Sequence, residues 1–255
     1  MSIPKNYKEL SVFTPENLLR EARRQKSVPE GAVPKICVLD PDGDIVQNLV
    51  TSGRAHPNPY WACYHTEMYN FTHKGIEVGI VGNAVGASFA VLVAEEMFAS
   101  GCGLLISMTS AGQIVSKGYP PYFVLIEKAL RDEGTSYHYL PPAPFSKINP
   151  KLIECLRRVF ERSNPPVFPG ATWTTDAPFR ETESAISYSK SQGILGVEME
   201  ASAAEAKGYP VICFAHITNQ MGNVVNDFEK GEAQGSLDAI QVISQAAEAW
   251  LSFTD

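Results

Sequence analysis

The sequence has no long apolar run. Across its 255 residues, no stretch approaches the roughly 20 consecutive apolar residues that a membrane-spanning helix needs. Residues 1–8, Met-Ser-Ile-Pro-Lys-Asn-Tyr-Lys, also lack the apolar core of a secretory signal peptide. We therefore expect a cytoplasmic protein that has no membrane as partner.

Basic residues are fewer than acidic residues in this sequence. Lys and Arg total 21 against 28 Asp and Glu, which gives a formal net charge of -7 at pH 7. An acidic surface is not attracted to nucleic-acid phosphates or to anionic lipid headgroups. This balance disfavours a nucleic acid as partner and favours a small molecule.

Cysteine is sparse, and its pattern excludes two classes of site. The number is odd, the spacing is not that of metal ligands, and most of the cysteines lie inside apolar runs. We expect reduced core thiols, no disulfide, no metal site and no cofactor. The five residues are Cys37, Cys63, Cys102, Cys155 and Cys213.

The sequence does contain apolar, β-branched runs that alternate with helix-like segments. This alternation predicts an α/β fold, with a parallel strand–helix–strand unit over residues 76–108. We expect one domain over residues 1–255, with residues 1–32 as an N-terminal helical arm whose helix begins at Thr14-Pro15-Glu16. Strands are predicted at 33–39, 61–71, 76–81, 104–108, 122–126, 170–176, 194–200 and 211–217, of which 61–71 and 76–81 form a hairpin, and helices at 87–97, 150–160, 201–206 and 237–253.

Polar side chains follow four of the predicted strands. Because ligands of open α/β sheets bind outside the carboxyl ends of the strands, these ends are the candidate site. The four segments are Thr109-Ser110, residues 176–180, residues 198–200 and Thr218-Asn219.

The segment Gly196-Val197-Glu198-Met199-Glu200-Ala201-Ser202-Ala203 carries two carboxylates at the end of one strand. Two acids in an apolar segment need partners, so the pair is either functional or a capping or salt-bridged pair on a turn. The segment resembles the signature of the nucleoside phosphorylase superfamily, and the chain is closest to its uridine phosphorylase-like members. The resemblance implies that Met199 and Glu200 bind the ribose, with the Glu200 carboxylate accepting hydrogen bonds from its hydroxyls.

The resemblance extends in order over roughly residues 35–250. It implies a three-layer α/β/α sandwich around a mixed, barrel-like sheet, assembled as a homodimer or a hexamer. It also implies that Phe179, Arg180 and Asn219 contact the base, and that Glu200, Asn219 and Arg180 are catalytic. The anion or water site would consist of Ala84, Gly86, Thr109 and Ser110.

Each of these roles has a plainer alternative. Asn219 could satisfy a turn, and Phe179 could be a core aromatic beneath a loop. Arg180 could form a surface salt bridge with Glu181 or Glu183. A neutral amide at Asn219 also suits a 6-oxopurine or a pyrimidine better than the adenine that relatives protonate with an aspartate.

The chain departs from the resemblance where uridine phosphorylases hold phosphate with arginines. Gly43 and Ser107 occupy two of those positions, and the third falls near Pro59, with Arg54 the nearest arginine. A phosphate dianion needs cationic or multiple N–H partners. We therefore expect hydrolysis of the N-glycosidic bond of a nucleoside or related N-riboside. The alternatives are phosphorolysis with a remodelled anion site and a non-catalytic nucleoside-binding or storage role.

Overall fold

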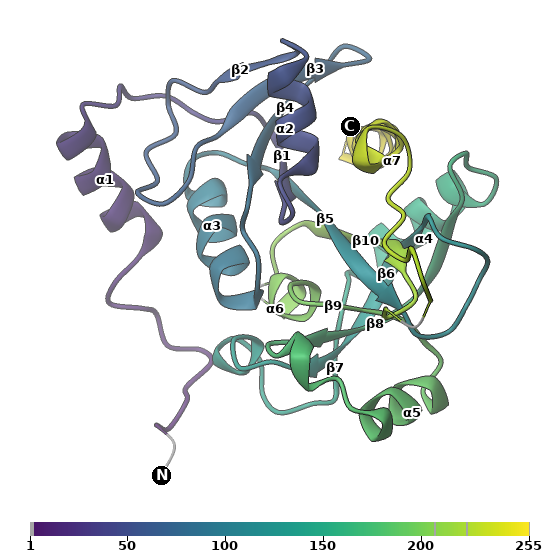
Figure 1. Cartoon of the computed structure of the whole chain (residues 1–255). Helices are drawn as coiled ribbons and strands as arrows, with labels where there is room; N and C mark the ends of the chain where they lie inside the picture. Colours follow the sequence, from purple (N-terminus) through teal and green to yellow (C-terminus); the bar gives the residue numbers. More distant parts are fainter. Residues whose placement is uncertain (1–2, 207, 223, 255) are drawn as a thin grey trace.

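The protein is built around one mixed β-sheet that curls into a closed barrel. Its fold was obtained as a computed structural model, which describes residues 3–206, 208–222 and 224–254. Within that part, the ten strands follow the order β10-β6-β8-β9-β5-β1-β4-β3-β2, with β7 paired to β6 and β10 also paired to β5. The second pairing of β10 closes the sheet and confirms the predicted mixed, barrel-like architecture (Figure 1).

The strands carry most of the fully buried side chains. All five residues of β1 and all nine of β10 are buried, as expected for strands covered on both faces. The strands are β1 (Ile36–Asp40), β2 (Ala55–Pro57), β3 (Tyr69–His73), β4 (Ile76–Gly82), β5 (Leu104–Gln113), β6 (Tyr122–Asp132), β7 (Phe145–Lys147), β8 (Val167–Thr175), β9 (Ile194–Glu198) and β10 (Val211–Asn219).

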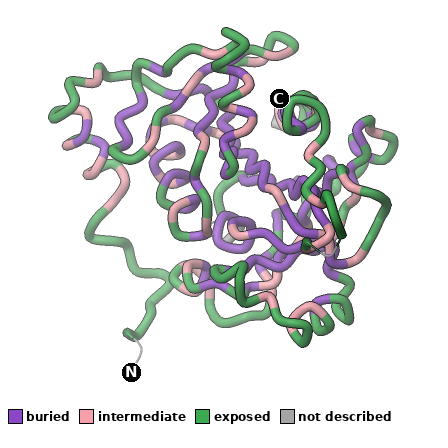
Figure 2. The backbone as a smooth tube through the Cα atoms, viewed as in Figure 1, coloured by how far each residue is buried: buried purple, intermediate pink, exposed green. Residues whose placement is uncertain are grey.

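Helices pack on both sides of this sheet. Apolar residues of α2, α4 and α7 share one core cluster with the sheet, and those of α3 and α6 share another, which gives the three expected layers. Figure 2 shows the buried backbone concentrated in the sheet and on the inner sides of these helices. The helices are α1 (Pro15–Lys26), α2 (Asp44–Thr51), α3 (Ala87–Ala99), α4 (Pro150–Phe160), α5 (Glu183–Ser191), α6 (Ala201–Ala206) and α7 (Ser236–Thr254), with short 3-10 turns at Ser136–His138, Pro178–Arg180 and Glu232–Gly235.

The predicted strand–helix–strand unit is present as β4, α3 and β5. Both β4 and β5 run parallel to β1, which lies between them. Because all three are parallel, the segments that follow them meet at one edge of the sheet. This edge holds the candidate site.

Several boundaries differ from the sequence prediction. β5 extends to Gln113 instead of ending at residue 108, because the polar residues Thr109 and Ser110 still pair with Ala215 and His216 of β10. Helix α2 was not predicted at all. It follows Gly43, whose left-handed backbone (φ 83°, ψ 2°) leads the chain from the turn after β1, residues 41–43, directly into the helix.

The N-terminal helix forms as predicted and packs against α3. Thr14 caps it by accepting a hydrogen bond from the Asn17 N–H at 3.3 Å. The aromatic residues around Trp61 differ in exposure: Trp61 itself is 6% exposed, whereas the neighbouring Tyr60 and Tyr64 keep more than a third of their surface. The indole N–H of Trp61 donates to Thr66, which explains how it is buried without loss of its hydrogen bond.

Two general features complete the fold. The five cysteines are free thiols, of which only Cys155 is partly exposed. None of the helices in the described ranges is long and apolar enough to cross a bilayer.

Candidate active site

The four polar strand ends line one pocket of about 490 Å³. The strand ends of β5, β8, β9 and β10 contribute, and the turn after β1 and the segment after β10 close it. The lining residues are Asp42, Ser110, Ala111, Gly112, Pro178, Phe179, Glu181, Val197, Glu198, Met199, Thr218, Asn219, Met221, Phe228 and Lys230.

Glu198 is the structural member of the carboxylate pair. It accepts hydrogen bonds from the hydroxyls of Thr172 (3.0 Å) and Thr174 (2.6 Å) and from the N–H groups of Glu200 and Ala201 (both 2.7 Å). Burial raises its pKa, and these four donors oppose the shift. Glu198 therefore caps the start of α6 and ties β8 to β9.

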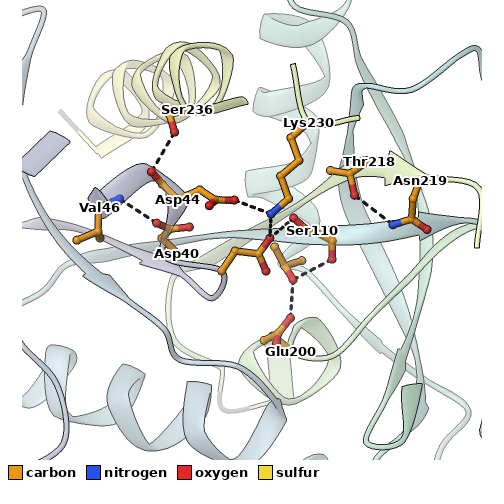
Figure 3. Close-up of polar contacts among 11 residues, drawn as sticks. Asp40, Asp44, Val46, Ser110, Glu200, Thr218, Asn219, Lys230 and Ser236 are labelled. Carbon is orange, nitrogen blue, oxygen red and sulfur yellow. Dashed lines mark hydrogen bonds and ion pairs between the residues drawn. The ribbon is translucent and has the colours of Figure 1, made fainter. Parts of the chain in front are cut away.

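Glu200 lies at the other side of the same turn and is 2% exposed. Its Oε1 accepts from the Gly86 N–H at 2.8 Å, and its Oε2 accepts from the Thr109 hydroxyl at 2.5 Å and from the Met199 N–H at 3.2 Å. Burial, together with the charge of Glu198, raises the pKa of Glu200 to about 7. Figure 3 shows Glu200 directly beneath the β5 segment that carries Ser110.

The anion or water site predicted from the sequence is thus partly occupied by the protein itself. The Gly86 N–H and the Thr109 hydroxyl both donate to Glu200. Ala84 is fully buried, and the Ser110 hydroxyl donates to Asp42 instead of facing an empty site.

The turn after β1 places three carboxylates beside these groups. Lys230, which belongs to the segment after β10, reaches across and donates to Asp42 at 2.6 Å and to Asp44 at 2.5 Å (Figure 3). Burial works against its positive charge, but the two carboxylates prevail and raise the pKa of Lys230. Asp40 is buried at the strand end, where it accepts from the Val46 N–H at 3.0 Å, and desolvation raises its pKa to about 7.

A second, much smaller cavity of about 20 Å³ lies on the far side of Asp42 and Ser110. His216 forms part of its wall, stacked on Phe123 with ring centroids 4.4 Å apart, and burial lowers the pKa of His216 to about 4. Its lining is Asp40, Asp42, Asp44, Ile45, Met108, Thr109, Ser110, His216, Gln234, Gly235 and Ala239. Asp42 and Ser110 are therefore the boundary between the two spaces.

Asn219 ends β10 in the wall of the large pocket. Its Nδ2 donates to the Thr218 hydroxyl at 3.2 Å, and its Oδ1 accepts from the Met221 N–H at 2.9 Å. The side chain thus makes the turn contacts that were its plainer alternative while still lining the pocket.

The loop after β8 contributes Phe179 and Glu181 to the pocket but not Arg180. Phe179 lines the pocket and is 99% exposed, so it is not a core aromatic. Arg180 is exposed and forms no ion pair with Glu181 or Glu183 within the described ranges. Glu181 is half-buried, and burial raises its pKa to about 7.

Sequence reasoning missed Lys230 and the pocket-facing role of Glu181. Lys230 pairs with carboxylates 186 and 188 positions away, so no local pattern could have indicated it. The run of acids at Asp40, Asp42 and Asp44 is visible in the sequence, but its spacing indicates only a turn and not a partner for Lys230. No group of three or more His, Cys, Asp or Glu side chains in the described part of the chain is arranged to hold a metal ion.

Comparison with known proteins agrees with this architecture. Residues 35–248 match the family described as the phosphorylase superfamily. No curated protein sequence matches the chain. Among solved structures, uridine phosphorylase from Vibrio fischeri is similar at 21% identity and a TM-score of 0.71, over 87% of this chain and 92% of that chain.

Two nucleosidases are similar to the chain to nearly the same degree. AMP nucleosidase from Bacteroides thetaiotaomicron matches at 17% identity with a TM-score of 0.70, over 94% of this chain and 99% of that chain. The 5'-methylthioadenosine/S-adenosyl homocysteine nucleosidase of Campylobacter jejuni matches at 17% identity with a TM-score of 0.67, over 85% of this chain and 100% of that chain. Since the family match covers most of the sequence, the chain belongs to the phosphorylase superfamily of glycosidic-bond-cleaving enzymes.

Proposed function

We propose that this protein hydrolyses the N-glycosidic bond of a nucleoside or related N-riboside, with water as the nucleophile. The observation that carries the proposal is the acidic character of the space from which a nucleophile would approach. Asp40, Asp42 and Asp44 line the small cavity, and Lys230, in the wall of the large pocket, donates to two of these carboxylates.

A phosphate dianion is poorly matched to these surroundings. It would meet carboxylates at short range, and like charges in a partly closed pocket repel strongly because the effective dielectric is low. No arginine lines either cavity within the described residues. Lys230 is already shared between two carboxylates, so it offers little net positive charge to an incoming anion.

The size of the small cavity supports the same conclusion. A buried water needs at least about 10–15 Å³ of accessible volume and a few polar partners. The cavity of about 20 Å³ fits one water, and its walls offer carboxylates and hydroxyls. A phosphate is several times larger and would have to displace the surrounding side chains.

Asp42 is the carboxylate best placed to activate that water. It lines both spaces, and its contacts with Ser110 and Lys230 both involve Oδ2. In the described part of the chain its Oδ1 has no hydrogen-bond partner and is available to accept a proton. As the water oxygen bonds to the anomeric carbon, its proton passes to Asp42 and the bond to the base breaks.

Met199 and Glu200 are the groups proposed to hold the ribose. Met199 lines the large pocket, and Glu200 lies immediately behind it. A carboxylate has about four acceptor positions, so one on Oε1 remains after its contacts with Gly86, Thr109 and Met199. The charged acceptor would fix the orientation of a ribose hydroxyl that reaches it.

The side chain of Asn219 favours one class of base. Asn219 can donate or accept a hydrogen bond but cannot supply a proton, so a 6-oxopurine or pyrimidine nucleoside suits it better than adenosine.

The exposed aromatic rings of Tyr60 and Tyr64 favour assembly into a homodimer or larger oligomer. Light scattering at micromolar concentration tests this assembly, and a monomer would contradict it.

The decisive experiment measures base release from a panel of nucleosides in phosphate-free buffer and again with millimolar phosphate. We expect equal rates in the two buffers and ribose, not ribose 1-phosphate, as the product. Asp42→Asn should lose most of this activity. Strict dependence on phosphate, with ribose 1-phosphate formed, would show that the protein is a phosphorylase.

A further inference from the structure

Glu181 is an unexplained carboxyl group in the large pocket. It follows the 3-10 turn Pro178–Arg180 and is half-buried in the wall formed by the loop after β8. It has no hydrogen-bond or ion-pair partner in the described ranges, although burying a carboxyl without a partner is unfavourable. Such a group is retained most readily where a ligand supplies the missing partner.

The loop that carries Glu181 is fixed at both ends. The Ala177 N–H donates to the Thr175 hydroxyl at 3.1 Å, and Asp176 accepts from the Gly134 N–H at 2.9 Å. On the other side, Thr182 caps α5 by accepting from the Ala185 N–H at 3.3 Å. The carboxyl is therefore presented to the pocket by a braced segment.

The other candidates for proton donation in this pocket are already engaged. Glu198 accepts four hydrogen bonds from protein donors, and Asp42 is paired with Lys230 and Ser110. Asn219 has no acidic proton to give. This leaves Glu181 as the pocket carboxyl that is free to carry and transfer a proton.

Resting on the proposed hydrolysis, we propose that Glu181 is the general acid that protonates the departing base. As the bond between the anomeric carbon and the base nitrogen breaks, its electron pair goes to the base. The Glu181 carboxyl proton moves to a ring nitrogen or oxygen of the base and leaves a carboxylate. The attacking water gives its proton to Asp42, and exchange with solvent restores Glu181 to its acid form.

The protonation state of Glu181 agrees with this role. Burial alone raises its pKa to about 7, so a substantial fraction carries a proton near neutral pH. The charged groups that face it across the pocket are Asp42, Glu198 and Lys230, and Arg180 and Glu183 flank it on its own segment. A general acid is most effective when its pKa lies close to the working pH.

The test compares a nucleoside with 4-nitrophenyl β-D-riboside, whose leaving group departs without needing a proton. Glu181→Gln should lower kcat on the nucleoside by about 10²–10⁴, the usual contribution of a general acid, and leave cleavage of the nitrophenyl riboside nearly unchanged. The wild-type kcat on the nucleoside should also fall as the pH rises through about 7, and the variant should lack this decline. The exposed Glu183→Gln is the matched control and should behave as wild type on both substrates.

The outcomes separate the two proposals. Equal loss on both substrates, or no loss on the nucleoside, would overturn the general-acid role while leaving the hydrolase assignment in place. Failure of the wild-type protein to cleave either riboside would overturn the proposed function itself and the role of Glu181 with it.

Discussion

Two neighbouring turns at one edge of the sheet differ sharply in charge. The turn after β1 carries the carboxylates of Asp40, Asp42 and Asp44, whereas the turn after β4 offers backbone N–H groups at the start of α3. The strands end side by side, with Asp40 opposite Gly82. A helix N-terminus of this kind favours anions, and an acidic turn repels them.

The difference shows that the protein supplies its own anions to this site. At the second turn, the Gly86 N–H already donates to the carboxylate of Glu200, which lies in the turn after β9, 114 positions away. At the first turn, Lys230 is neutralised by Asp42 and Asp44. The Gly86 N–H at the second turn and the Lys230 ammonium at the first turn, both of which could attract a phosphate, are thus satisfied internally, which favours a neutral nucleophile.

The contact between Glu200 and Gly86 at the second turn depends on Glu198. Glu198 holds the end of β9 and the start of α6 in place, so that Glu200 reaches Gly86. Glu198→Ala would leave two threonine hydroxyls and two N–H groups buried without an acceptor. We expect a loss of about 3–5 kcal/mol in the free energy of unfolding, measured by urea denaturation. Glu154→Ala, which removes an exposed helix pair with Arg158, should change it by no more than about 0.5 kcal/mol. An equally small loss of unfolding free energy in both variants would show that the hydrogen bonds of Glu198 do not stabilise the fold.

Glu200→Gln removes the negative charge that the protein itself supplies at the second turn. Gly86 and Thr109 donate to the two different carboxylate oxygens of Glu200, and a glutamine amide has only one oxygen that can accept. The substitution therefore loses one of these contacts, and it weakens the contact proposed for the ribose. A charge-assisted hydrogen bond is worth about 1.5–3 kcal/mol, so kcat/KM should fall by roughly one to two decades. Steady-state kinetics on the best nucleoside substrate measures this. Wild-type kcat/KM in a folded variant would mean that Glu200 has only a structural role.

Much of this site could be predicted from the sequence, and the parts that could not share a physical reason. The motif around Met199 and Glu200 and the polar strand ends are local patterns. The absence of an arginine at position 43 was also visible, but its cause was not. Gly43 has a φ of 83°, and a side chain there would place its Cβ 2.6 Å from the Asn83 Oδ1, so an arginine cannot simply be restored. Contacts such as Lys230 with Asp42 depend on the folded topology and leave no local pattern.

The pH dependence of stability tests the buried acid of the first turn. Burial raises the pKa of Asp40 from 3.8 to about 7, so between these values the folded state holds a proton that the unfolded state has released. Folding stability must then decrease as the pH rises through this window, by at most about 1.4 kcal/mol per pH unit from this one group. Asp40→Asn should flatten the slope of unfolding free energy against pH, whereas the exposed Asp238→Asn should not. An unchanged slope in Asp40→Asn would mean that Asp40 titrates normally.

The smallest expected effect concerns the ion pairs that bring Lys230 to the first turn. The three side chains remain 22–30% exposed, so water and salt screen their attraction. Lys230→Met keeps most of the side-chain length but removes the charge, and we expect a loss of about 1 kcal/mol in unfolding free energy at low ionic strength. Because the effect is electrostatic, it should shrink in 1 M salt, where the Debye length is about 3 Å. Lys190→Met on α5 serves as the control, since its side chain makes no ion pair in the described ranges. A loss in Lys230→Met that is equally large at both salt concentrations would show that packing, not charge neutralisation, holds this segment against the acidic turn.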